Sequence, residues 1–118
     1  MKLLGLRTII YPTRDLAQDK VWWEDILGKE PYFDKEFYVG FDAGGYELGI
    51  DPKAELSDGP ITYWGIEDVD EAVEHFMKND CELYSEPRDT GNGITVAIVQ
   101  KLYDQQLIGL IYNPHFKV

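Results

Sequence analysis

The strongest constraint on the fold is that one order of expected elements occurs twice along the 118 residues. Each half starts with a short run of β-branched and aromatic residues, continues with a helix-like stretch and ends in strand-like segments separated by turns. Arg14-Asp15-Leu16 in the first half corresponds to Glu67-Asp68-Val69 in the second, because each stretch follows a strand and opens a helix. Neither half is large enough to bury a core alone, so the repeat predicts two units that pair about a pseudo-twofold axis around one pocket.

Turn and cap signals set the expected boundaries of these elements. Thr13 or Asp15 can cap the first helix, since a side-chain oxygen accepts an unpaired backbone N–H, and Gly28 can end it. We expect a single domain over residues 1–118, with one repeat at about 1–52, the other at about 60–118 and a polar linker at 51–59. The expected strands are 6–11, 37–41, 46–50, 61–66, 82–84, 94–99 and 107–112, and the expected helices are 15–27 and 68–79.

Charge and cysteine content exclude several classes of protein. The chain has 22 acidic against 11 basic residues and a net charge of −11, which argues against nucleic acids and anionic membranes as partners. Its single cysteine, Cys81, rules out an intrachain disulfide and a zinc site made of cysteines. We see no signal peptide and no apolar run long enough to cross a membrane, so the expected location is the cytoplasm.

The order and spacing of several short motifs resemble the vicinal-oxygen-chelate superfamily, also called the glyoxalase/bleomycin-resistance/extradiol-dioxygenase fold. In the first half, the resemblance is carried by residues 13–16, by the end of the helix at 22–28 and by Tyr46-Glu47-Leu48. In the second half, it is carried by 66–72 and by 103–110, which looks like the family's Asp-Pro-Asp-Gly-Asn-Leu-Ile-Glu-Leu ending. The resemblance implies an α+β fold in which two βαβββ repeats form a curved eight-stranded half-barrel with the helices outside.

The same resemblance implies a concave face that holds a divalent metal or a small molecule. Carried over residue by residue, the four metal-ligand positions of the family correspond to Thr8, Glu47, Ile61 and Gly109. The family prefers histidine or glutamate at these positions, and only Glu47 fits. A divalent cation needs several oxygen or nitrogen donors that converge on one point, so one carboxylate supplies too few. The sequence therefore predicts no metal ligand set and no cofactor.

Alternation of side chains along a strand extends this set of pocket positions. If Thr8 faces the pocket, Ile10 does too, whereas Ile9 and Tyr11 pack against the helix. Tyr63 likewise shares a face with Ile61, and it is a candidate to stack on a planar ligand or to donate its hydroxyl. The expected ligand-binding residues are Thr8, Ile10, Glu47, Ile61, Tyr63, Gly109, Ile111 and Asn113. A mostly apolar lining with a few polar groups is typical of a small-molecule site.

We interpret the chain as a metal-free small-molecule-binding protein of the glyoxalase/bleomycin-resistance type, which holds an organic ligand in the concave pocket. Two other interpretations stay open. A lyase or isomerase of the glyoxalase superfamily would use Glu47 as acid or base. A regulatory or interaction module would keep the fold for dimerisation alone, with its cavity filled by side chains. The resemblance also implies a homodimer.

We do not expect the remaining cysteine, histidine and tryptophan residues to act in the site. Cys81 has no suggested base or third partner, so we expect an ordinary thiol. His75 is expected on a solvated helix face and His115 in the C-terminal tail. Trp22 and Trp23 are expected to serve core or dimer packing, because the implied fold places their helix outside the pocket.

Overall fold

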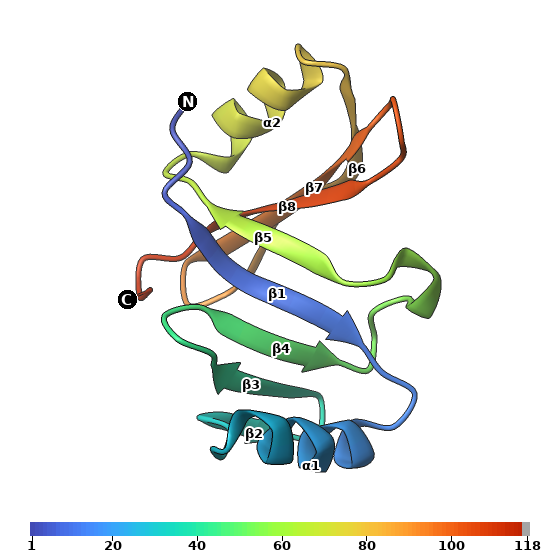
Figure 1. Ribbon diagram of the computed structural model, residues 1–118. Helices are drawn as coiled ribbons and strands as arrows, with labels where there is room; N and C mark the ends of the chain where they lie inside the picture. Colours follow the sequence, from blue (N-terminus) through green and yellow to red (C-terminus); the bar gives the residue numbers. More distant parts are fainter. Residues whose placement is uncertain (117–118) are drawn as a thin grey trace. The chain divides into compact units, whose positions relative to one another are not determined.

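A computed structural model describes residues 1–116 of the chain (Figure 1). Its described residues form two compact units, one of residues 8–61 and one that combines residues 1–7 with residues 62–116. Each unit contains one helix and four strands in the predicted order, strand, helix and three strands. Among the described residues, no helix combines the length and the apolar character that crossing a bilayer requires.

The unit of residues 8–61 is built on a four-stranded sheet with the order β2-β3-β4-β1. β1 runs parallel to β4, and β4, β3 and β2 follow one another as antiparallel neighbours. Its elements are β1 (Leu6–Pro12), α1 (Leu16–Leu27), β2 (Phe33–Lys35), β3 (Tyr38–Asp42), β4 (Glu47–Asp51) and the short 3-10 helix η1 (Leu56–Asp58).

Local signals account for both ends of α1. The Asp15 carboxylate caps the helix by accepting from the Gln18 N–H at 3.1 Å, and Gly28 ends it with a φ of 69°. Thr13, the other predicted cap, instead accepts from the Asp15 N–H and donates to the Asp19 carboxylate. The prediction of the helix is confirmed, with the cap assigned to Asp15.

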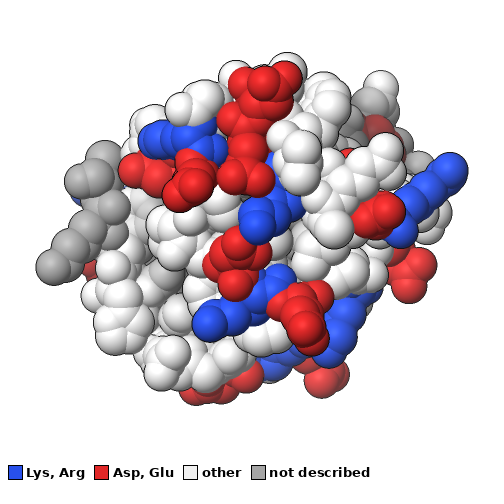
Figure 2. All heavy atoms as spheres, turned by 90° about the horizontal axis from the view of Figure 1, so that it is seen from below, with Lys and Arg blue, Asp and Glu red and all other residues white. Residues whose placement is uncertain are grey.

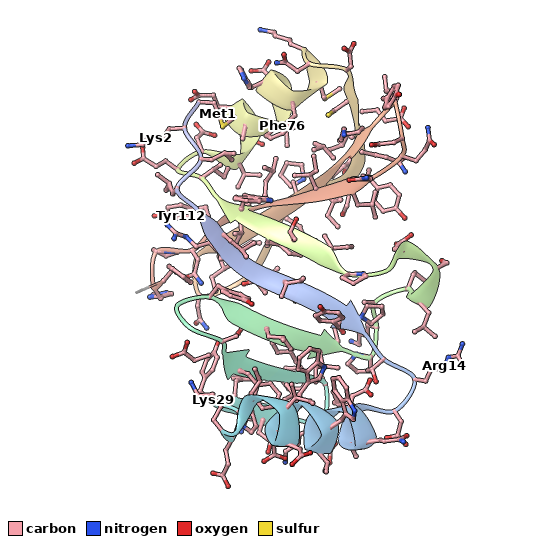
Figure 3. All side chains as sticks on the ribbon, in the orientation of Figure 1. Met1, Lys2, Arg14, Lys29, Phe76 and Tyr112 are labelled. Carbon is pink, nitrogen blue, oxygen red and sulfur yellow. The ribbon has the colours of Figure 1, made fainter. Side chains whose placement is uncertain are left out.

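The core of this unit lies between α1 and one face of its sheet. Phe41 and Ile50 are fully buried there, together with Val39 and Leu48. Five side chains of α1 and β1 pack on these four residues: Ile9, Tyr11, Leu16, Trp23 and Leu27. Figure 3 shows side chains filling the space between α1 and the strands beside it. Burying a side chain such as Phe41 contributes about 1.5–3 kcal/mol. Ile9 and Tyr11 thus pack on the helix side, as predicted.

The unit that contains residues 62–116 has the strand order β5-β8-β7-β6. β5 runs parallel to β8, whereas β7 is antiparallel to both β8 and β6. Its elements are β5 (Ile61–Gly65), α2 (Val69–Met77), β6 (Cys81–Gly91), β7 (Ile94–Lys101) and β8 (Leu107–Tyr112). The N-terminal segment joins this unit, because the Leu4 N–H donates to the Gly65 carbonyl at 2.8 Å and the Gly65 N–H donates to the Gly5 carbonyl at 2.9 Å.

The second core lies between α2 and the strands β6, β7 and β8. Asp68 caps α2 by accepting from the Glu71 N–H at 3.1 Å. Three residues of the helix, Val69, Ala72 and Val73, are buried against the sheet. The other buried members of this core are Ile66, Cys81, Ala97, Val99 and Leu110.

Two strands differ from the sequence-based expectation. Only residues 82–84 were expected to form a strand, but β6 extends over 11 residues to Gly91. Its pairing with β7 shifts register three times, and these irregularities accommodate Pro87 and the polar residues around it. β2 was not expected, because three residues show no alternation; its pairing with β3 creates it.

Candidate functional site

The candidate site lies on the sheet of the unit of residues 8–61, on the face that points away from α1. Leu48 and Ile50 point into the core beneath α1, so Glu47 and Gly49 lie on the other face. The parallel register pairs Thr8 with Glu47 and Ile10 with Gly49. The predicted association of Thr8, Ile10 and Glu47 on one face is consistent with this register.

Two tyrosine hydroxyls converge on the Glu47 carboxylate. Tyr38, on β3, donates to Oε1 at 2.6 Å, and Tyr32 donates to Oε2. The Tyr32 N–H also donates to the Gly40 carbonyl at 3.0 Å, which holds the segment before β2 against β3. Hydrogen bonds to an ionised carboxylate are among the strongest in proteins, so the three side chains form one polar cluster. We call Tyr32, Tyr38 and Glu47 the Glu47 cluster.

Two glycines make this arrangement possible. A Cβ atom on Gly49 would lie 1.8 Å from the Tyr38 hydroxyl, and a Cβ atom on Gly40 would lie 2.8 Å from Oε2 of Glu47. Tyr38 therefore crosses the bare backbone of β4 to reach the carboxylate. A side chain at either position would displace a member of the Glu47 cluster.

The tyrosines of the cluster hold their protons strongly. Burial raises the pKa of Tyr38 well above its ordinary value, and the negative charge of Glu47 and the hydrogen bond to it raise this pKa further. The pKa of Tyr32 is raised by burial of its hydroxyl end and by the hydrogen bond to Glu47, although 65% of the residue is exposed. Both hydroxyls are therefore donors at neutral pH, and Glu47 is the acceptor.

The structure places the remaining predicted site residues as follows. Ile61 begins β5 and is buried. In the unit of residues 62–116, Tyr63 pairs with Gly109, and a Cβ atom on Gly109 would lie 2.5 Å from the Tyr63 ring. Ile111 is buried, and the Asn113 side chain accepts from the His115 N–H at 2.9 Å. Tyr63 and Gly109 are thus in contact, whereas the Asn113 side chain is used in a local turn.

The cysteine, histidine and tryptophan side chains described next lie outside the predicted site and make packing or local contacts. Cys81 is buried in the core beside α2, and burial raises the pKa of its thiol, which disfavours the reactive thiolate. The His115 ring contacts the Asn92 carbonyl at 2.8 Å. Trp23 packs against Tyr11 with ring centroids 5.3 Å apart, while Trp22 is 55% exposed. The interpretation of Trp23 as a core residue is confirmed.

The residues do not fit the divalent metal that the resemblance implies. Of the four corresponding positions, Thr8, Glu47, Ile61 and Gly109, only Glu47 has a carboxylate, and each of its oxygens already accepts a tyrosine hydroxyl. No group of three histidine, cysteine, aspartate or glutamate side chains in the described part of the chain is arranged to hold a metal ion. A hard divalent cation needs more oxygen ligands than this cluster offers.

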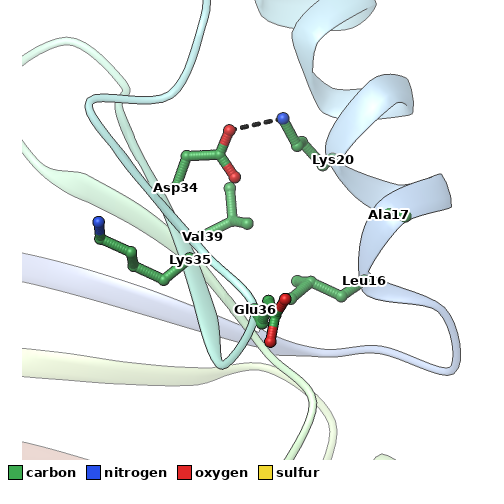
Figure 4. A pocket seen from close by; sticks show the side chains of 7 residues that line it. All are labelled: Leu16, Ala17, Lys20, Asp34, Lys35, Glu36 and Val39. Carbon is green, nitrogen blue, oxygen red and sulfur yellow. Dashed lines mark ion pairs between the residues drawn. The ribbon is translucent and has the colours of Figure 1, made fainter.

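A shallow hollow of about 530 Å³ lies at a different place, between α1 and the β2–β3 hairpin (Figure 4). Leu16, Ala17 and Val39 give it an apolar floor, and the Lys20 amine spans its rim to the Asp34 carboxylate at 2.6 Å. It contains none of the predicted site residues. On the face drawn in Figure 2, acidic and basic side chains are interspersed, so the excess negative charge is not gathered into one patch there.

Two members of the Glu47 cluster were missed in the sequence. Alternation along the strand 38–42 could have placed Tyr38 opposite the core, because Val39 and Phe41 are its buried residues. No comparable signal exists for Tyr32, since it lies outside any regular element. Neither tyrosine was among the predicted site residues, and both donate to Glu47.

Comparisons with known proteins define the fold. No family model matches the sequence, and no curated protein matches it. A glyoxalase/bleomycin resistance protein/dioxygenase superfamily member from Vibrio splendidus is 16% identical with a TM-score of 0.69, and the match covers 91% of this chain and 97% of that one. Methylmalonyl-CoA epimerase from Mycobacterium tuberculosis is 16% identical with a TM-score of 0.69, over 95% of this chain and 90% of the epimerase.

A hypothetical protein from Bacillus halodurans has a TM-score of 0.77 at 10% identity, over 96% of both chains. Identities this low carry information about the fold and not about the activity. The chain has the vicinal-oxygen-chelate, glyoxalase-like fold, as its sequence predicts.

Proposed function

We propose that this protein binds a small organic molecule against the sheet face that carries the Glu47 cluster, without the help of a metal. The observation that carries the proposal is the cluster itself, in which one carboxylate is held by two protonated tyrosines on a bare strand surface. Apolar side chains with a few fixed polar groups are the usual composition of a small-molecule site. Thr8 and Ile10 lie on the same face and supply further lining.

The donor chemistry supports binding without a metal. Glu47 is the single carboxylate among the four positions at which the fold usually places ligands, and its oxygens are engaged by Tyr32 and Tyr38. A rigid, hydrogen-bonded carboxylate is well suited to orient a polar group of a ligand, because little side-chain freedom is lost on binding.

One observation favours a second candidate, a lyase or isomerase that uses Glu47 as acid or base. This candidate requires a second polar group beside Glu47, and the Tyr38 hydroxyl lies 2.6 Å from its Oε1. Turnover of a bound compound that Glu47→Gln abolishes would establish this candidate. Binding without turnover supports the first proposal.

The test is a ligand screen with matched variants. Purified protein is screened by thermal shift against small amines, carboxylic acids and neutral aromatic compounds, and each stabilising compound is titrated calorimetrically. We expect Glu47→Gln to weaken binding roughly tenfold, because a charge-assisted contact is lost. Glu86→Gln removes the same charge from an exposed position on β6 and should leave binding unchanged. Compounds that bind both variants equally would contradict the proposal.

Three further expectations belong to this proposal. A homodimer and a cytoplasmic location remain predictions from the resemblance and from composition, as does the absence of nucleic-acid partners from a chain of net charge −11. Native mass spectrometry with elemental analysis of the same sample measures the oligomeric state and any bound metal or organic adduct. A stoichiometric divalent metal would contradict the metal-free proposal.

A further inference from the structure

The charge of Glu47 is not neutralised by any basic side chain of the described chain. Ion pairs occur elsewhere among residues 1–116, but none of them includes Glu47. Its two oxygens accept from Tyr32 and Tyr38, which supply hydrogen bonds and no positive charge. A partly buried carboxylate without a cationic neighbour is stabilised when a ligand brings that charge.

Four aromatic side chains form a connected group that begins at this carboxylate. Tyr32 and Tyr38 touch Glu47 directly, and the Phe33 ring packs on Tyr38 with centroids 6.0 Å apart at an interplanar angle of 62°. The Phe37 ring lies 6.0 Å from Phe33. Tyr32 and Phe37 are 65% and 59% exposed, so part of this aromatic surface is open to solvent. Aromatic faces attract cations, and the attraction strengthens as water is excluded.

The register explains why these rings gather. Phe33 pairs with Gly40, and Gly40 pairs with Gly49, so Phe33 stands on the face that carries Glu47. Tyr38 lies two residues before Gly40 on β3 and therefore points to the same side. Exposed apolar patches that are rimmed by polar groups mark binding sites, and these rings form such a surface beside a carboxylate.

The same chemistry distinguishes between kinds of cation. A hard divalent metal demands several oxygen donors at short range, and this cluster has one carboxylate already engaged by two hydroxyls. An alkylated ammonium is weakly hydrated and requires no fixed coordination number. It gains from one negative charge and several ring faces, which is how aromatic cages recognise such groups.

We propose that the ligand of this face is a monovalent organic cation, an alkylated or quaternary ammonium, with its charge against Glu47 and its N-alkyl groups against Tyr32, Tyr38 and Phe33. The inference rests on the proposed function and adds the chemical class of the ligand. The net charge of −11 favours the approach of such a cation.

The test compares choline with 3,3-dimethyl-1-butanol, its neutral isostere, in which carbon replaces the ammonium nitrogen. Both are titrated into the full chain by calorimetry or NMR, with benzyltrimethylammonium as a second cation. We expect choline to bind roughly tenfold more tightly than the isostere, because only choline carries a charge for Glu47. Raising the salt concentration should lower the affinity for choline and leave the affinity for the isostere unchanged.

Variants locate the binding. Glu47→Gln should lower the affinity for choline roughly tenfold. Tyr32→Leu should lower this affinity about two- to fivefold, because one aromatic ring is lost. Tyr32 is largely exposed, so Tyr32→Leu keeps the test valid if Glu47→Gln fails to fold. The matched controls are Glu86→Gln and Tyr103→Leu, the latter at a 91% exposed tyrosine, and neither should change the affinity.

The outcomes separate the inference from the proposed function. Equal affinity for choline and its isostere, or choline binding that neither Glu47→Gln nor Tyr32→Leu weakens, overturns the inference. If both cations fail to bind while a neutral or anionic compound binds in a Glu47-dependent way, the inference is overturned and the proposed function stands. If no compound of any class binds, both are overturned.

Discussion

The two βαβββ units of this chain share one topology but bury their helices differently. α2 buries Val69, Ala72 and Val73 against its sheet, whereas no residue of α1 is fully buried. α1 is held by partly buried side chains, Leu16, Trp23 and Leu27, and leaves Trp22 and Ile26 exposed. The two units therefore hold their helices on the sheet with different sets of apolar contacts, fully buried for α2 and partly buried for α1.

The faces opposite the helices differ even more. In the first unit, Tyr38 crosses Gly49 to donate to Glu47, and in the second Tyr63 lies over Gly109. Both arrangements place an aromatic ring on a glycine, and in the first unit the hydroxyl of that ring donates to a carboxylate. In the first unit, the close approach of a tyrosine to a glycine therefore helps to hold the polar cluster around Glu47.

The largest effects are expected from the two cores. Phe41→Ala and Leu110→Ala each remove a fully buried side chain, one from each unit. We expect the free energy of unfolding to fall by about 3–5 kcal/mol for Phe41→Ala and about 2–5 kcal/mol for Leu110→Ala. Chemical denaturation followed by circular dichroism measures both. A loss below 1 kcal/mol at either position would show that this core is more adaptable than its burial indicates.

Gly49 and Gly109, which lie beneath aromatic rings, occupy equivalent places in the two units. Gly49→Ala and Gly109→Ala each place a Cβ atom where a tyrosine stands, so each should lower the free energy of unfolding by about 1–3 kcal/mol. Only Gly49→Ala displaces the hydroxyl that donates to Glu47. Stability measurements combined with calorimetric titration of any Glu47-dependent ligand should therefore show lost binding in Gly49→Ala alone. Equal effects on binding would contradict the assignment of the site to the first unit.

Alkaline titration tests the Glu47 cluster itself. The pKa values of Tyr32 and Tyr38 are raised in the folded protein, so their stabilising contribution is complete below the unfolded tyrosine pKa of about 10. It is lost as the pH rises above that value, because the unfolded chain releases these protons first. Stability should fall with pH less steeply in Tyr38→Phe than in the unmodified chain. Ultraviolet difference spectra and denaturation at several alkaline pH values measure this; identical slopes would contradict it.

The smallest expected effects concern the helix caps. Asp15→Ala and Asp68→Ala each remove a side chain that accepts from a backbone N–H in the first turn. Each should cost about 0.5–2 kcal/mol of unfolding free energy. Thermal denaturation of the two variants side by side measures the difference between the units. Asn substitutions at the same positions serve as controls, since asparagine caps helices as well as aspartate does.

Much of the architecture follows from local features of the sequence. Asp15 and Gly28 mark the ends of α1 because capping and left-handed backbone depend on single residues. Strand alternation correctly assigned Ile9 and Tyr11 to the helix side, because successive side chains point to opposite faces. The repeat of elements predicted two units, and the resemblance to the vicinal-oxygen-chelate superfamily implied their βαβββ order, which the structure shows.

The chemistry of the site depended on tertiary structure. Glu47 meets Tyr38 nine residues away and Tyr32 fifteen residues away, and both contacts require the β3–β4 register and the reach of the side chains. The 11-residue length of β6 likewise arises from bulged pairing with β7, which its turn-like composition conceals. The sequence alone indicates which side chains of a strand share a face, because that depends on the two-residue period of the backbone. Which side chains touch was decided by packing, because strand register and rotamers are fixed only when the strands pair.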